Sequence, residues 1–268
     1  MLATSLCFST SQARTVDEIE ATREVRICVA GSSHQLYRAM GKEFARFLDV
    51  KPVIIKLHSW DQQFHNAAGK TVKKSISPPA LLANGTCDLY PNNLVVKPWR
   101  LQKLAIVPLY NSWMTVITHK SRKKQFNKLA DLGGKRVSIM KNTSYHSWLE
   151  TTNQTALKNN PVQIIFADTD ASMQAVNNGT VDFTLIGADG AFNWTRQKVP
   201  DLEIAFPVGQ TSLIGWATHQ EHIELQAALH GFFIRQHKPD SALNRIWMEH
   251  VGISLNEFNE FIGTFTYL

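Results

Sequence analysis

Short apolar runs and stretches with helical spacing alternate along the chain. The first unit begins with an apolar run at 25–30, continues with a helical stretch at 35–48 and ends with a β-branched run at 52–57. Within the helical stretch, one face carries the apolar residues Leu36, Met40, Phe44 and Phe47. This alternation predicts an α/β protein with mostly parallel sheets flanked by helices.

The pattern divides into two series of comparable length. Before residue 119, further strands are expected at 87–90, 104–107 and 113–118. After it, the expected strands are 136–140, 162–166, 181–186, 204–208 and 213–218, and the expected helices are 144–150, 171–177, 223–237, 241–250 and 254–265. Two series predict two lobes: residues 23–115 with 218–268 form lobe 1, and 116–217 form lobe 2. The chain would then cross the hinge twice, near 113–118 and 213–218.

Composition narrows the class of protein. Of the 268 residues, 44% are hydrophobic and 19% are charged, which excludes a mostly disordered chain. No run approaches the roughly 18 consecutive apolar residues of a transmembrane helix. The net charge of +6 favours an anionic partner. Much of the basic excess lies in 119–128, where a solvated helix face is favoured over a nucleic-acid patch because no aromatic array accompanies the lysines. We expect no nucleic-acid partner.

The N-terminal segment has two interpretations. Residues 1–13 are weakly apolar and uncharged, and Ser11 and Ala13 occupy positions −3 and −1 of a cleavage site before Arg14. This arrangement is similar to the back half of a secretory signal, although a basic start is missing. Residues 1–22 are therefore either a signal remnant or a disordered tail.

Cysteine usage gives a further expectation. Apart from Cys7, the chain has Cys28 and Cys87, each in an apolar, strand-like run. Such positions predict buried free thiols, with one disulfide as the alternative in an oxidising compartment. The chain has no CxxC pair and no Cys/His cluster at metal-ligand spacing, so we expect neither a metal nor a cofactor.

Common catalytic motifs are absent from the sequence. It has no GxSxG elbow, phosphate loop, GxGxxG or HExxH, and we expect a function other than catalysis. Three other segments are more informative. Residues 85–110 contain Asp88 and, twelve positions later, Arg100; residues 131–145 run from Asp-Leu-Gly-Gly-Lys to Asn-Thr-Ser-Tyr; residues 173–189 contain a Gly-x-x-Asp that ends at Asp182.

In order and spacing, these segments resemble the signatures of type 2 periplasmic solute-binding proteins, specifically the amino-acid-binding family 3. The resemblance covers the chain from Val25 to the C-terminal helices. It implies a two-lobed type II fold that captures a small anionic ligand, an amino acid or a carboxylate, between the lobes. It also implies a periplasmic location and a membrane partner, either an ABC-type permease or a sensor. A ligand-sensing ectodomain of a sensor kinase or cyclase, and a dehydratase-like enzyme on the same fold, are the alternatives.

The resemblance also assigns the ligand-binding residues. Arg100 matches the carboxylate-binding arginine, whose planar fork grips a carboxylate at two points. Ser144 would meet the same anion at the start of a helix. Asn92 and Asn93 would add hydrogen bonds, and aromatic residues would wall the ligand: Tyr37, Trp60, Tyr90 and Trp113. A surface ion pair for Arg100, a helix-capping role for Ser144, turn roles for the asparagines and core roles for the aromatic residues are the alternatives.

One departure from the family pattern concerns amine recognition. The family places an acidic residue five positions after the equivalent of Asp182, but this chain has Gly187 there, and Asp189 lies two positions further on. Asp189 either takes over the amine or caps the following helix. The ligand is therefore a non-standard amino acid, a carboxylate without an amine, or another anion. For the enzymatic alternative, a buried Asp88 or Asp189 would be the general acid.

Overall fold

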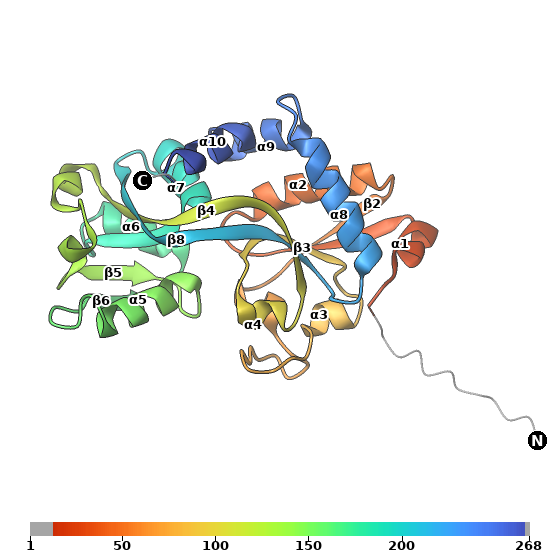
Figure 1. Cartoon of the computed structure of the whole chain (residues 1–268), viewed down its shortest axis with the longest axis horizontal. Helices are drawn as coiled ribbons and strands as arrows, with labels where there is room; N and C mark the ends of the chain where they lie inside the picture. Colours follow the sequence, from red (N-terminus) through yellow and green to blue (C-terminus); the bar gives the residue numbers. More distant parts are fainter. Residues whose placement is uncertain (1–12, 266–268) are drawn as a thin grey trace, which may run out of the picture.

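The computed structural model describes residues 13–265, in which eight strands form one continuous sheet (Figure 1). The spatial order is β2-β1-β3-β8-β4-β7-β5-β6. The strands are β1 (Glu24–Val29), β2 (Lys51–Lys56), β3 (Leu89–Val95), β4 (Ala105–His119), β5 (Arg136–Ile139), β6 (Gln163–Phe166), β7 (Phe183–Gly187) and β8 (Leu202–Thr218). Of the segment 1–22, expected to be a signal remnant or a disordered tail, residues 1–12 lie outside the described residues. In the described remainder, Val16–Thr22 form a helix capped by Thr15.

Parallel pairs form the two ends of the sheet, and antiparallel pairs form its middle. At one end β1 pairs with β2 and β3, and at the other β5 pairs with β6 and β7, all in parallel. Between them, β4 and β8 run antiparallel from Ala105↔Thr218 to His119↔Leu202. In Figure 1 these two long strands cross the middle of the molecule and join its two halves. The α/β fold and the double crossing are therefore confirmed.

Helices cover both halves of the sheet. In chain order they are α1 (Val16–Thr22), α2 (His34–Phe47), α3 (Ala80–Ala83), α4 (Pro98–Leu101), α5 (Ser144–Gln154), α6 (Thr169–Asn177), α7 (Ala188–Asn193), α8 (Ile223–Gln236), α9 (Ala242–Val251) and α10 (Leu255–Phe265). Short 3-10 turns, η1 (Asp61–Phe64), η2 (Lys120–Gln125) and η3 (Leu129–Leu132), and a π-helical turn, η4 (Trp194–Lys198), complete the chain. Within residues 13–265, no helix has the length and apolar character of a membrane span.

The largest hydrophobic core lies mainly in the predicted lobe 1 but also includes Ala188 and Phe192 of α7, and a second core lies in the predicted lobe 2. In lobe 1, α2, α8, α9 and α10 pack around Phe44, Trp216 and Trp247. In lobe 2, apolar residues of β5, α5 and β7 pack around Phe126 and Phe183. Ile214, Trp216 and Ala217 belong to lobe 1 cores, although the sequence places them in lobe 2. We propose that β8 enters lobe 1 by Ile214, near the start of the expected crossing segment 213–218, so that the lobe boundary lies before Ile214 rather than at 217/218.

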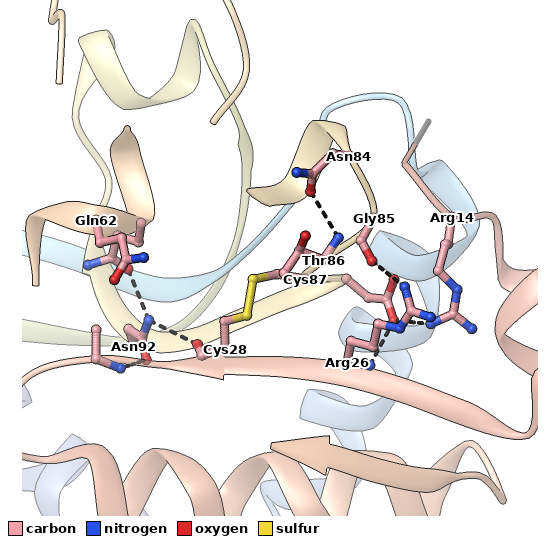
Figure 2. Close-up of a disulfide and its surroundings, with 12 residues drawn as sticks. Arg14, Arg26, Cys28, Gln62, Asn84, Gly85, Thr86, Cys87 and Asn92 are labelled. Atoms are coloured by element: carbon pink, nitrogen blue, oxygen red, sulfur yellow. Dashed lines mark hydrogen bonds and ion pairs between the residues drawn. A yellow bond between two sulfur atoms is a disulfide. The ribbon is translucent and has the colours of Figure 1, made fainter. Parts of the chain in front are cut away.

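A disulfide joins Cys28, in β1, to Cys87, just before β3 (Figure 2). The expectation of free thiols is therefore wrong, and its alternative holds. Both residues are buried at the pairing of two parallel strands, with their Cα atoms 5.7 Å apart. Sequence spacing did not reveal the pair because 59 positions separate the two cysteines.

We expect the Cys28→Ala/Cys87→Ala double variant to lose about 2–4 kcal/mol of unfolding free energy, because a bridge closing so long a loop restricts the unfolded chain. Urea unfolding with and without reductant measures this. Reductant should destabilise the wild type by a similar amount and leave the double variant unchanged. Equal unfolding free energies for the oxidised wild type and the double variant would contradict the prediction.

Candidate functional site

A cavity of about 1160 Å³ is lined by residues of both lobes. Lobe 1 contributes the turn after β1, the segment from β3 to α4, and part of β4. Lobe 2 contributes the start of α5, the junction of β7 with α7, and part of β8. The carboxyl ends of parallel strands meet there, which is where ligands bind in α/β folds.

Arg100 is a buried cation in the wall of this cavity. Its side chain is only 4% exposed, Nη1 donates to the carbonyl oxygen of Val95 at 2.8 Å, and its guanidinium lies over the rings of Phe64 and Trp99 at 4.9 and 5.3 Å. Within residues 13–265 it forms no ion pair, and its Nε has no hydrogen-bond partner. Burial lowers its pKa to about 10. A buried charge without a counter-ion is costly, so this position favours an anionic ligand.

Asp189 is the only acidic residue among the described residues that line the cavity. It lies in the first turn of α7 and accepts hydrogen bonds from the Tyr110 hydroxyl at 3.0 Å and from Ser112 Oγ at 3.3 Å. Burial raises its pKa above the usual value of 3.8, and the two hydroxyl donors oppose this shift. In the described part of the chain it has no cationic partner.

Gly187 makes room for that carboxylate. A Cβ atom at position 187 would lie 2.6 Å from Asp189 Oδ1, closer than real Cβ atoms approach. The backbone N–H of Gly187 donates to the Tyr145 hydroxyl at 2.9 Å, which ties α5 to the start of α7. The glycine at the family's acidic position and the carboxylate two residues later are therefore sterically linked features of one site.

Both asparagines, Asn92 and Asn93, lie within a bulge of β3. The register with β8 shifts between Tyr90 and Leu94, and Asn93 has a φ of 51°. Asn93 lines the cavity, is 8% exposed, and neither polar atom of its side chain has a hydrogen-bond partner in the described residues. An unpaired buried amide at a cavity is a candidate ligand contact.

Asn92 instead joins three segments of lobe 1 (Figure 2). Its Oδ1 accepts from the backbone of Ala30 at 3.1 Å, and its Nδ2 donates to Cys28 O at 3.2 Å and Gln63 Oε1 at 3.0 Å. Tyr90 is fully buried in the core around the disulfide. Neither residue is among those that line the cavity. The structure places Asn92 and Tyr90 in the interior beside the disulfide instead of at the candidate site, where they were expected.

The remaining sequence candidates do line the cavity: Tyr37, Trp60, Trp113 and Ser144. Ser144 is the first residue of α5, and the N-cap is Thr143, whose hydroxyl accepts from the His146 N–H at 3.3 Å. The capping alternative for Ser144 therefore does not hold. Tyr37 is 6% exposed, and burial raises the pKa of its hydroxyl.

Comparison with known proteins identifies the fold. The arginine-binding protein ArgBP from T. maritima, as its P235GK mutant, matches with a TM-score of 0.67 at 16% identity over 88% of this chain and 99% of that one. The ancestral amino-acid-binding protein AncCDT-1, described as a precursor of cyclohexadienyl dehydratase, matches at 0.68, with 16% identity over 88% and 99%. Tv2483 bound to L-arginine matches at 0.68, with 19% identity over 89% and 95%.

The chain has the type 2 periplasmic-binding-protein fold. A family model described as NMT1/THI5 like matches residues 80–208, which run from α3 through lobe 2 into β8. No curated protein sequence matches the chain. At 16–19% identity, the structural likenesses establish the fold and leave the ligand to be argued from the cavity itself.

Several cavity residues were missed at the sequence level: Lys73, Lys97, Ser112, Tyr145 and Trp148. Trp148 lies four positions after Ser144 on the same face of α5, so a helical projection from that residue would have found it, whereas Tyr145, one position after Ser144, is rotated away from that face. Lys73 comes from the long loop between η1 and α3, where no pattern points to the cavity.

The structure also separates the two proposed general acids. Asp88 is absent from the cavity wall and forms a buried ion pair with Arg14, with 2.9 Å between Arg14 Nη1 and Asp88 Oδ2. Only Asp189 faces the cavity. Among the described residues, no group of three His, Cys, Asp or Glu side chains is arranged to hold a metal ion.

Proposed function

We propose that the chain is a solute-binding protein that captures a small anionic ligand, an amino acid or a carboxylate, between its two lobes. The observation that carries this proposal is Arg100, a buried guanidinium in the cavity wall without a carboxylate partner among the described residues. A ligand carboxylate would supply the missing counter-charge and accept from the free Nε side of the guanidinium.

The second lobe completes the ligand contacts. Ser144 and the free N–H groups at the start of α5 would meet the same carboxylate, because a helix N-terminus favours an anion. Asp189, which accepts from two hydroxyl groups and has no cationic partner among the described residues, would pair with a ligand amine. A zwitterionic amino acid therefore satisfies both unpaired charges, and the proteins named above are described as binding amino acids.

Binding would proceed by closure of the lobes about β4 and β8. By the predicted bounds, Arg100 falls in lobe 1, whereas Ser144 and Asp189 fall in lobe 2. A ligand that contacts both sets stabilises the closed arrangement, because only that arrangement completes its hydrogen bonds. The disulfide supports a periplasmic location, since such bonds persist in oxidising compartments. The captured ligand would then be presented to an ABC-type permease or to a sensor kinase or cyclase.

A thermal-shift screen tests this proposal. Each amino acid and a set of simple carboxylates are compared with the matching carboxamides, which lack the negative charge. At a ligand concentration of 100 Kd, binding stabilises the fold by about 2.7 kcal/mol, which corresponds to a rise in Tm of about 5–10 °C for a chain of this size. At least one carboxylate should produce this rise and its carboxamide should not. Equal shifts for both, or none for any carboxylate, would refute the proposal.

A further inference from the structure

The tryptophans divide into two groups according to where they lie. Three of the seven, Trp194, Trp216 and Trp247, are buried in the cores. The other four are only partly buried, and all of them line the same cavity: Trp60, Trp99, Trp113 and Trp148. Large apolar surfaces that are left open inside one cavity indicate a ligand that covers them.

Two of these rings lie against glycines, one in each lobe. At Gly31, which has a φ of +82°, a Cβ atom would lie 3.0 Å from Trp60 Cε3. At Gly209, with a φ of +73°, it would lie 3.4 Å from Trp148 Nε1. Trp60 immediately precedes η1, and Trp148 lies in α5. Each indole is therefore packed against backbone on one side, which fixes its position while part of its surface stays open.

We propose that the ligand carries a planar aromatic ring on its carboxylate-bearing skeleton, and that Trp60 and Trp148 contact this ring from opposite lobes. The inference rests on the proposed function, because Arg100 must hold the carboxylate. Aromatic pairs gain energy beyond the area they bury, and their geometry is directional. Trp148 would thus determine specificity for the ring, whereas Arg100 determines binding of the anion.

A guanidinium group on the ligand could also stack on indoles, but it differs from an aromatic ring because it carries a positive charge. The charged residues that line the cavity are Lys73, Lys97, Arg100 and Asp189. Among the described residues, three cations and one carboxylate therefore line the cavity, and a ligand with a cationic side chain would add to this positive excess. An uncharged aryl group adds no such repulsion. The cavity therefore favours an aryl ligand over arginine.

Isothermal titration calorimetry of the purified protein tests the inference by measuring the Kd of four probes: L-phenylalanine, 3-phenylpropanoate, L-leucine and L-arginine. We expect L-phenylalanine or 3-phenylpropanoate to bind at least about 10-fold more tightly than L-leucine or L-arginine. The comparison of the two aryl probes shows whether Asp189 uses a ligand amine. Tighter binding of L-leucine or L-arginine, or no binding of any probe, would overturn the inference.

Substitutions at Trp148 locate the effect. Trp148→Ala should weaken aryl binding by about 3- to 10-fold and alter L-leucine binding less than twofold, whereas Trp148→Phe should retain most of the affinity. Phe166→Ala is the matched control, since Phe166 is an exposed lobe 2 aromatic outside the cavity. An equal loss for aryl and aliphatic probes would overturn the role of Trp148. If aliphatic carboxylates bind through Arg100 and Trp148 has no effect, this inference fails while the proposed function stands.

Discussion

The Arg100→Ala variant is expected to bind its carboxylate ligand at least about 30-fold more weakly than the wild type. Removing one partner of a buried, hydrogen-bonded charge pair costs about 2–5 kcal/mol, because the other charge stays buried and unpaired. Lys73, another cation that lines the cavity, is exposed to solvent, whereas Arg100 is only 4% exposed. The lysine should therefore not replace the buried guanidinium as the partner of the ligand carboxylate. Titration calorimetry with a ligand from the thermal-shift screen measures the loss.

Two comparisons show whether this loss comes from the ligand contact. Arg100→Lys keeps the charge but not the planar fork, so its affinity should fall between those of the wild type and the alanine variant. Lys97→Ala removes a partly buried cation from the cavity wall and should change affinity much less. The ligand-free Arg100→Ala protein should still unfold cooperatively, because the substitution also removes an unpaired buried charge. Unchanged affinity in Arg100→Ala would exclude the assigned role.

The alternation of strands and helices was sufficient to predict the α/β fold and its two crossings. From the sequence pattern, however, we expected two shorter strands in place of β4 and two in place of β8, because both long strands contain register shifts that interrupt the period of two. In β4 these shifts lie between Pro108 and Tyr110 and between Ser112 and Met114. Periodicity reports local pleating, so a bulged strand looks like two strands.

The sequence predicted a residue of the cavity wall correctly where the helix or strand that holds it determines which way the side chain points. Ser144 is the first residue of α5, Arg100 lies in the short helix α4 twelve positions after Asp88, and both line the cavity. Asn92 and Asn93 are identical in type and adjacent, yet only Asn93 lines it. The β3 bulge determines this difference through the left-handed backbone of Asn93, and nothing in the sequence Pro-Asn-Asn indicates which asparagine adopts it.

Lobe 1 stability should depend strongly on the buried ion pair between Arg14 and Asp88. Besides Asp88, Arg14 donates to Thr22 Oγ1 and to the carbonyl oxygen of Glu24, so it fixes α1 against β1. Asp88 is 1% exposed and also accepts from the Arg26 N–H at 2.7 Å. Arg14→Ala leaves this carboxylate without its cation, and we expect a loss of about 3–5 kcal/mol of unfolding free energy. Urea denaturation measures it.

The matched control is Arg23→Ala, which removes an exposed ion pair with Asp49 and should cost less than about 1 kcal/mol. Comparable losses for the two variants would contradict the role of the buried pair.

The pH dependence gives the second, independent signature of this pair. Burial raises the pKa of Asp88 from its usual 3.8 to about 6, against the lowering effect of Arg14. A carboxyl whose pKa is higher in the folded state than in the unfolded chain contributes most to stability below pH 4, and this contribution declines as the pH rises through about 6. Without Arg14 the pKa of Asp88 in the folded state rises further, so Arg14→Ala should be more strongly destabilised at pH 8 than at pH 5.

Adding Asp88→Asn removes the titrating group and should flatten the dependence of the unfolding free energy on pH. A difference between wild type and Arg14→Ala that does not vary with pH would show that the packing of the arginine, rather than its charge, stabilises α1.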